Sequence, residues 1–162
     1  MNRIRFVAVL ALLLLGGRVA ASAEVEWKAF EKGIQDASAK RKYGFVSVYT
    51  DWCGYCKKLE RETLRAQKVV AELDKHFVSM KLNAESEESI TWKGKKMSKR
   101  ELAASWGVEG YPTMLFLNSK GEIIGSFPSY AEADLMIKLL TYISSGARER
   151  KVSFEDYLKE PS

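Results

Sequence analysis

The chain's only two cysteines, Cys53 and Cys56, are separated by two residues. Cysteines at this spacing could form a redox-active dithiol, supply half of a zinc site or attach a haem covalently. Zinc needs about four ligands, typically cysteine or histidine, and the sequence offers one histidine, His76. Haem attachment needs a histidine directly after the second cysteine, where Lys57 stands. Carboxylates could still complete a zinc site, yet the pattern favours a redox couple with no metal ion or other cofactor.

A purely structural disulfide is a further alternative. A bond between Cys53 and Cys56 would close a very small ring. The entropy that a cross-link removes from the unfolded chain grows with the length of the closed loop, so this bond would stabilise the fold little. The pair is therefore better explained by chemistry than by stability.

The residues on either side of the pair indicate a strand followed by a helix. Phe45 to Thr50 is rich in aromatic and β-branched residues, which favours a buried strand. Cys53 then stands at a helix start, where unpaired N–H groups and the helix dipole favour a thiolate, and Lys57 adds positive charge. Cys56 follows one turn later and is expected to be shielded. We therefore predict a redox-active Cys53–Cys56 disulfide with Cys53 as the attacking nucleophile and Cys56 as the resolving thiol.

The rest of the pattern predicts an α/β fold with a central mixed sheet, one parallel crossover, a C-terminal β-hairpin and helices on both faces. Hydrophobic periodicity and turn residues give the expected elements. They are helices over 25–41, 57–63, 66–76, 98–106 and 131–144, strands over 45–50, 77–83, 113–117 and 122–127, and a polar loop or small insertion over 84–97. The helix at 98–106 begins with a capping box formed by Ser98 and Glu101.

The N-terminus has the composition of a secretory signal peptide. Arg3 and Arg5 precede ten apolar residues, and small residues then lead to an Ala21-Ser-Ala23 cleavage site. Ten apolar residues are too few for a hydrocarbon core that needs about 20, although an uncleaved anchor is the alternative. We expect a signal peptide over 1–23, one domain over 24–147 and a polar tail over 148–162, in a protein located in the periplasm.

Charge gives little reason to expect a nucleic-acid partner. Removing residues 1–23 takes away three arginines and no acid, which lowers the formal charge from +5 to +2. Basic stretches remain at 40–42 and 93–100, but no aromatic stacking platform is interleaved with them. We interpret both stretches as solvated surface.

The motif around the cysteines resembles the thioredoxin superfamily. Trp52-Cys-Gly-Tyr-Cys-Lys57 follows a predicted buried strand, and Tyr111-Pro-Thr113 precedes the predicted hairpin. The resemblance covers residues 27–145. More narrowly, residues 51–57 together with Glu60 resemble the C-terminal domain of the bacterial transmembrane disulfide reductase. Residues 101–113 and 120–130 resemble exported thioredoxin-like proteins, including those that accompany sulfur-oxidation enzymes.

This resemblance implies the thioredoxin fold and further site residues. It implies a cis Tyr111–Pro112 bond that faces the cysteines, with Tyr111 pairing to the extended backbone of a substrate. It also gives supporting places to Trp52 and Lys57, and to the Gly54-Tyr55 dipeptide, which tunes the reduction potential. The expected protein is a monomeric reductase of protein disulfides that receives electrons from a membrane-embedded thiol donor. A disulfide isomerase or oxidase of the same fold, and a binding adaptor with little turnover, are the alternatives.

One position departs from the family pattern. Thioredoxins carry a buried aspartate six residues before the nucleophile, where this chain has Ser47, whereas the strand lysine that accompanies it is present as Lys81. The missing carboxylate would help to deprotonate Cys56. Glu60 lies four residues after Cys56, on the same face of a helix. Glu60 either supplies that carboxylate or is a surface acid, and the sequence leaves both open.

The signal peptide gives a direct prediction. Cleavage after Ala23 should leave a mature chain that begins Glu-Val-Glu-Trp, because small residues at the cleavage site are what the processing enzyme accepts. N-terminal sequencing of protein from the periplasmic fraction checks this. Protein retained in membranes with Met1 or Asn2 at its start would contradict it.

Overall fold

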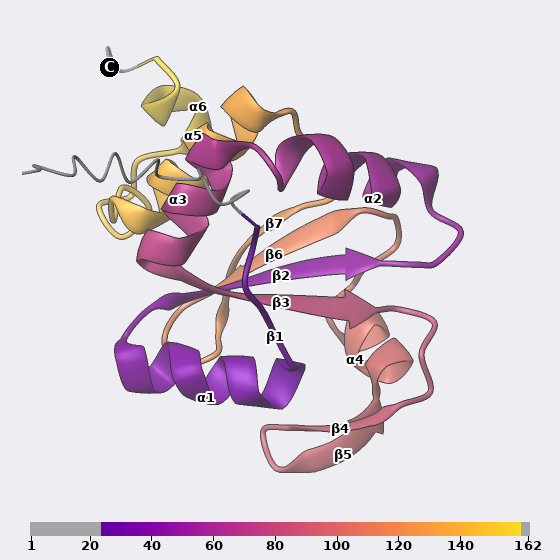
Figure 1. The fold of residues 1–162 in the computed structure, drawn as a ribbon. Coiled ribbons are helices and arrows are strands. Elements are labelled where there is room, and N and C mark those ends of the chain that lie inside the picture. The colour runs from indigo at the N-terminus through magenta and orange to yellow at the C-terminus, as the bar shows by residue number, and fades with distance from the viewer. Residues whose placement is uncertain (1–23, 160–162) are drawn as a thin grey trace, which may run out of the picture.

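A computed structural model describes residues 24–159 (Figure 1); the predicted signal peptide lies outside the described residues. The helical segments are α1 (Phe30–Lys40), α2 (Gly54–Lys58), a π-helical turn η1 (Leu59–Thr63), α3 (Gln67–His76), α4 (Lys99–Ser105), α5 (Ala133–Ser144) and α6 (Phe154–Tyr157). The strands are β1 (Trp27–Lys28), β2 (Tyr43–Tyr49), β3 (Phe77–Asn83), β4 (Ser89–Trp92), β5 (Lys95–Ser98), β6 (Thr113–Leu117) and β7 (Ile123–Phe127).

Five strands form the central sheet in the order β1-β3-β2-β6-β7. β3 runs parallel to both β1 and β2, whereas β6 is antiparallel to β2 and to β7. The predicted α/β class, the mixed sheet and the C-terminal hairpin, formed by β6 and β7, are confirmed. β2 is the middle strand of the sheet. The loop that follows β2 therefore leaves the sheet midway between its two edge strands.

Helices cover both faces of the sheet because alternate strand residues point to opposite sides. Phe45 belongs to the core under α3 and α5, whereas its neighbour Val46 belongs to the core against α1 and α4. Figure 1 shows α2, α3 and α5 on one side of the sheet and α1, α4 and the β4–β5 hairpin on the other. Ser47, which shares the side of Phe45, therefore faces the layer that carries the cysteines.

The first helix begins five residues later than predicted, at Phe30 instead of Val25. Residues 25–41 have apolar residues at helical spacing, but the chain enters the sheet at β1 and the helix begins at Phe30. The reason lies in packing: Trp27 contacts Phe45 in one core, while Phe30 contacts Trp92 and Trp106 in the other. The two aromatics that looked like one helical face lie on opposite faces of the sheet.

Residues 84–97 were predicted to be a polar loop or a small insertion, and the structure shows a small insertion with regular structure from Ser89 onward. β4 and β5 form a separate antiparallel pair, connected through Lys93 and Gly94. Both of these residues have positive φ, at 49° and 77°, as a tight two-residue hairpin turn requires. Ile90 is buried and Trp92 packs on Trp106, so the hairpin adds to the core on the α4 side.

The remaining elements agree more closely with the predictions. The Ser98–Glu101 capping box is present at the start of α4. The predicted polar tail contains α6, which packs on α5 through the contact of Phe154 with Tyr142. Over the described residues 24–159, no helix has the length and apolarity needed to cross a membrane.

Candidate active site

The two cysteines form a disulfide at the point where β2 gives way to α2. The S–S distance is 2.13 Å. Cys53 is the N-cap of α2, and its Sγ accepts a hydrogen bond from the backbone N–H of Cys56 at 3.0 Å. An N–H group at a helix start that already contacts sulfur would stabilise negative charge on Cys53 once the disulfide is opened. This geometry places the predicted nucleophile where a thiolate is favoured.

Exposure alone does not distinguish the two cysteines in the oxidised protein, since Cys53 is 4% and Cys56 8% exposed. What distinguishes them is what lies behind each sulfur. Cys56 lines a cavity of about 210 Å³ between α2, η1 and the ends of β2 and β3, whereas Cys53 does not. The cavity is walled by Ser47, Tyr49, Thr50, Asp51, Cys56, Lys57, Glu60, Leu64 and Lys81. The assignment of attacking and resolving thiols stays a prediction.

The sheet register places Ser47, where thioredoxins have a buried aspartate, beside Lys81. Ser47 and Lys81 are paired across β2 and β3, so both side chains point to the face that carries the cysteines. The Lys81 ammonium forms an ion pair with Glu60 from η1 and lies 4.7 Å from the ring centroid of Trp27. Lys81 therefore has a carboxylate partner, and that carboxylate lines the same cavity as Cys56.

Two further polar groups face this cavity. The hydroxyl of Thr50 is buried and has no hydrogen-bond partner among the described residues. Burial raises the pKa of the Tyr49 phenol, and the nearby charge of Asp51 acts in the same direction. Tyr49 thus stays a neutral hydroxyl across the physiological range, which leaves Glu60, Asp51 and the lysines as the charged groups beside Cys56.

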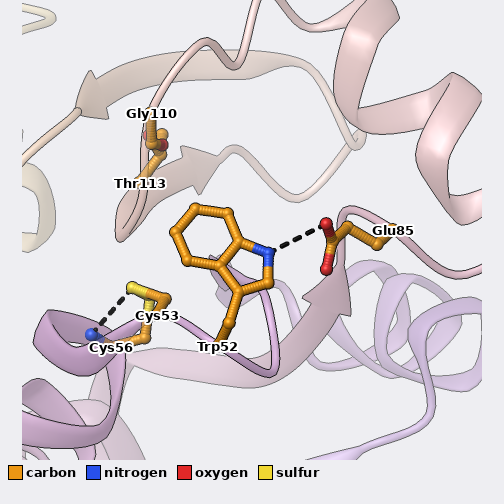
Figure 2. Close-up of a disulfide and its surroundings, with 6 residues drawn as sticks. All are labelled: Trp52, Cys53, Cys56, Glu85, Gly110 and Thr113. Carbon is orange, nitrogen blue, oxygen red and sulfur yellow. Dashed lines mark hydrogen bonds between the residues drawn. A yellow bond between two sulfur atoms is a disulfide. The ribbon is translucent and has the colours of Figure 1, made fainter.

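Trp52 stands exposed next to the disulfide. Its side chain is 67% exposed, yet its indole N–H donates a 2.9 Å hydrogen bond to Glu85, with the ring lying between the disulfide and Glu85 (Figure 2). The ring also meets Tyr111 edge-on, with centroids 6.0 Å apart. Trp52 is therefore fixed by contacts on two sides despite its exposure.

The loop before β6 contains a cis peptide bond. The Tyr111–Pro112 bond is cis, and the Thr113 hydroxyl donates a 2.7 Å hydrogen bond to the carbonyl of Gly110. Pro112 is buried, while Tyr111 is half-buried. The Trp52–Tyr111 contact places this loop beside the residue that precedes Cys53.

The residues next to the cysteines on α2 are exposed, and Lys57 also lines the cavity behind Cys56. Gly54 and Lys57 are exposed, and Tyr55 is 64% exposed. The Lys57 backbone N–H also donates to the Cys53 carbonyl at 3.2 Å, which closes the first turn of the helix. The structure thus gathers all the predicted site residues in one region, on the surface of α2, in the adjoining loop or around the cavity behind Cys56.

Sequence reasoning missed the residues that hold Trp52. Asn83 ends β3, its amide donates to Asp51 at 3.2 Å, and its side-chain oxygen accepts the backbone N–H of Glu85 at 2.9 Å. Because the carboxyl ends of neighbouring parallel strands lie at the same edge of a sheet, residues after β3 could have been expected beside residues after β2.

Among the described residues, the structure brings together no group of three metal-ligating side chains.

Comparisons with known proteins agree with this architecture. Residues 30–144 match the sequence family of thioredoxin-like domains. The protein disulfide-isomerase of Datisca glomerata is 28% identical over 121 residues, which are 75% of this chain and 22% of that protein. The chain spans about a fifth of the length of the curated relatives that it matches.

Solved structures give the same fold. A thioredoxin-fold protein from Helicobacter pylori has a TM-score of 0.63 and 22% identity, over 74% of this chain and 80% of that one. The C-terminal domain of DsbD from Neisseria meningitidis, in its reduced form, has a TM-score of 0.52 and 21% identity, over 68% of this chain and 90% of that one. At 22% and 21% identity, these similarities show a shared fold and nothing further.

The cavity generates a prediction for Glu60. If this carboxylate accepts the proton of Cys56, Glu60→Gln should slow the release of mixed disulfides by about tenfold or more, within the range of a positioned acid–base group. Attack by Cys53 should change much less. Stopped-flow reduction of a model disulfide, followed by tryptophan fluorescence across pH, separates the two steps. The difference should shrink above about pH 8.5, where an ordinary cysteine ionises unaided.

Glu62→Gln is the matched control. Glu62 is 43% exposed, against 51% for Glu60, and lies on the same turn, but it pairs with Arg61 and Lys58 outside the cavity. An exposed ion pair contributes about 0–1 kcal/mol to stability, so neither substitution should unfold the protein. Overlapping pH profiles for wild type and Glu60→Gln would make Glu60 a surface acid.

Proposed function

Because the chain belongs to the thioredoxin-like family and joins its two cysteines at a helix start, we propose that it is a thiol–disulfide oxidoreductase that reduces protein disulfides. The family match confirms the resemblance noted around Trp52-Cys-Gly-Tyr-Cys-Lys57. We also propose the direction of electron flow, the substrates and the location.

The observation that carries the proposal is the polar cavity behind Cys56. In a reductase the mixed disulfide must be resolved quickly, and this requires the second cysteine to lose its proton while it is buried. Cys56 shares its cavity with the Glu60 carboxylate, which the Lys81 ammonium holds in place. An isomerase instead benefits from a mixed disulfide that persists. A proton acceptor beside Cys56 therefore favours reduction over isomerisation.

The chemistry would proceed in two exchanges. The Cys53 thiolate attacks one sulfur of a substrate disulfide, and the other substrate sulfur leaves as a thiolate. Cys56 then passes its proton towards Glu60 and attacks the Cys53 sulfur, which releases the second substrate thiolate and forms the Cys53–Cys56 disulfide. The substrate gains two electrons, and the two cysteines lose them. A thiol donor must then reduce the disulfide again.

The proposed setting follows from the N-terminal segment. A cleaved signal peptide would place the chain in the periplasm, where a supply of electrons has to come through the membrane. We therefore propose a membrane-embedded thiol protein as donor and disulfide-bonded exported proteins as substrates. The chain would act as a monomer and without a nucleic-acid partner.

Isomerisation is the second candidate function. It is favoured by one observation, that the curated relatives given above include a protein named disulfide-isomerase. That relative is about five times as long as the region of similarity, because 22% of it is matched. An adaptor that binds a partner without turnover is the third candidate.

We predict that the protein accelerates insulin reduction by dithiothreitol, and that Cys53→Ser abolishes this activity because no attacking thiolate remains. Cys56→Ser should instead trap mixed disulfides with substrates, since the resolving thiol is gone. Turbidity measures the reduction, and non-reducing electrophoresis detects the trapped species.

Wild type and Glu62→Gln serve as active controls in this assay. A protein that binds insulin but leaves its reduction rate unchanged would be an adaptor. Recovery of scrambled ribonuclease activity without net insulin reduction would favour an isomerase. Alkylation of Cys56 before Cys53 in the reduced protein would reverse the assigned roles.

A further inference from the structure

A second aromatic pair lies on the α2 side of the disulfide and has no part in the mechanism above. Tyr55 comes from the dipeptide between the cysteines, and Tyr130 comes from the loop between β7 and α5. Their ring centroids are 6.1 Å apart. Tyr55 is 64% exposed and Tyr130 is half-buried, so the pair presents aromatic surface to solvent next to Cys53.

Tyr130 is held in place by the last residue of α2 and by η1. The Lys58 ammonium lies 4.7 Å from the centroid of the Tyr130 ring. The buried Thr63 hydroxyl donates a 2.7 Å hydrogen bond to the carbonyl of Ala131, which ties the loop to η1. Because the ring is fixed before any ligand arrives, binding against it loses little side-chain entropy. An aromatic held in this way suits recognition better than a freely rotating one.

The surface beside Tyr130 carries charges of both signs. The Lys58 ammonium covers the ring and reaches the Glu62 carboxylate at 3.8 Å. Contacts with Arg61 first, and in part with Tyr130, lower the pKa of Glu62, which stays ionised beside the ring. Lys57 is exposed but lines the cavity behind Cys56 together with Glu60 and Lys81. Selection at this pair is therefore expected from aromatic contact and not from net charge.

We propose that Tyr55 and Tyr130 form a specificity subsite for an aromatic side chain next to the reactive cysteine of an extended segment of the substrate. This inference rests on the proposed function. Tyr55 stands between the two cysteines, so a substrate segment joined to Cys53 passes close to it. An added aromatic ring would stack on this fixed pair. The pair thereby selects which disulfides react fastest.

The test uses two peptides in which a single cysteine is disulfide-linked to thionitrobenzoate. They differ only before the cysteine, which is preceded by Glu-Phe or Glu-Ser. Attack by Cys53 joins its sulfur to the peptide sulfur and releases thionitrobenzoate, whose absorbance gives the second-order rate constant. The reduced wild-type protein should favour Glu-Phe over Glu-Ser by about tenfold, the equivalent of one aromatic contact.

Tyr130→Ala should reduce the Glu-Phe to Glu-Ser ratio to about two or less, because the stacking surface is lost. Tyr130→Phe keeps the ring and should keep the ratio. Tyr157→Ala removes a tyrosine of α6 that packs on Tyr142 of α5, and this variant should also keep the ratio. If Tyr130→Ala does not fold, as judged by circular dichroism, Tyr55→Ser provides the same test at an exposed position. An unchanged ratio in the folded variant would overturn the subsite.

Binding separates this inference from the proposed function. The same peptides with serine in place of cysteine are titrated into the oxidised protein and followed by NMR. A preference for Glu-Phe that Tyr130→Ala removes, in a protein that reduces no insulin, would leave the subsite standing and overturn the reductase. Insulin reduction without a preference between the peptides would overturn the subsite and leave the reductase standing.

Discussion

The structure depends on one junction, where the buried central strand β2 passes directly into the start of α2. Cys53 caps the helix there, and the N–H of Cys56 points at its sulfur. A strand in the middle of the sheet fixes the position of this junction, because it is hydrogen-bonded on both sides by β3 and β6. The same edge of the sheet brings in the end of β3, which carries Lys81 and Asn83. The nucleophile Cys53, the cavity behind Cys56 and the Glu85 side chain that binds Trp52 all lie at that end of the strands.

The departure at Ser47 changes where the negative charge lies. A carboxylate on β2 would be buried, whereas Glu60 on η1 is about half exposed and reaches the paired position Lys81 from the helix side. Moving the carboxylate to a more exposed place lowers the cost of keeping it ionised, since burial penalises charge. Under the proposed mechanism, Cys56 gains an acceptor at that smaller cost.

Much of this could be predicted from sequence because the signals were local. The Cys-x-x-Cys pair after an apolar strand and the capping box at Ser98 each depend on neighbouring residues. The failures involved long-range packing: Trp27 and Phe30 fit one helical face but lie on opposite sides of the sheet. The Trp52–Glu85 hydrogen bond joins residues 33 positions apart, and Tyr130 reaches the site through a loop after β7. No local pattern reports such contacts.

The central claim is that the Cys53–Cys56 couple donates electrons, and its equilibrium reduction potential tests this most directly. The protein is equilibrated in glutathione buffers of known ratio, and the oxidised fraction is read from tryptophan fluorescence. We expect a value towards the thioredoxin end of the family range, near about −270 mV. A value near about −120 mV, typical of strongly oxidising relatives, would contradict the account.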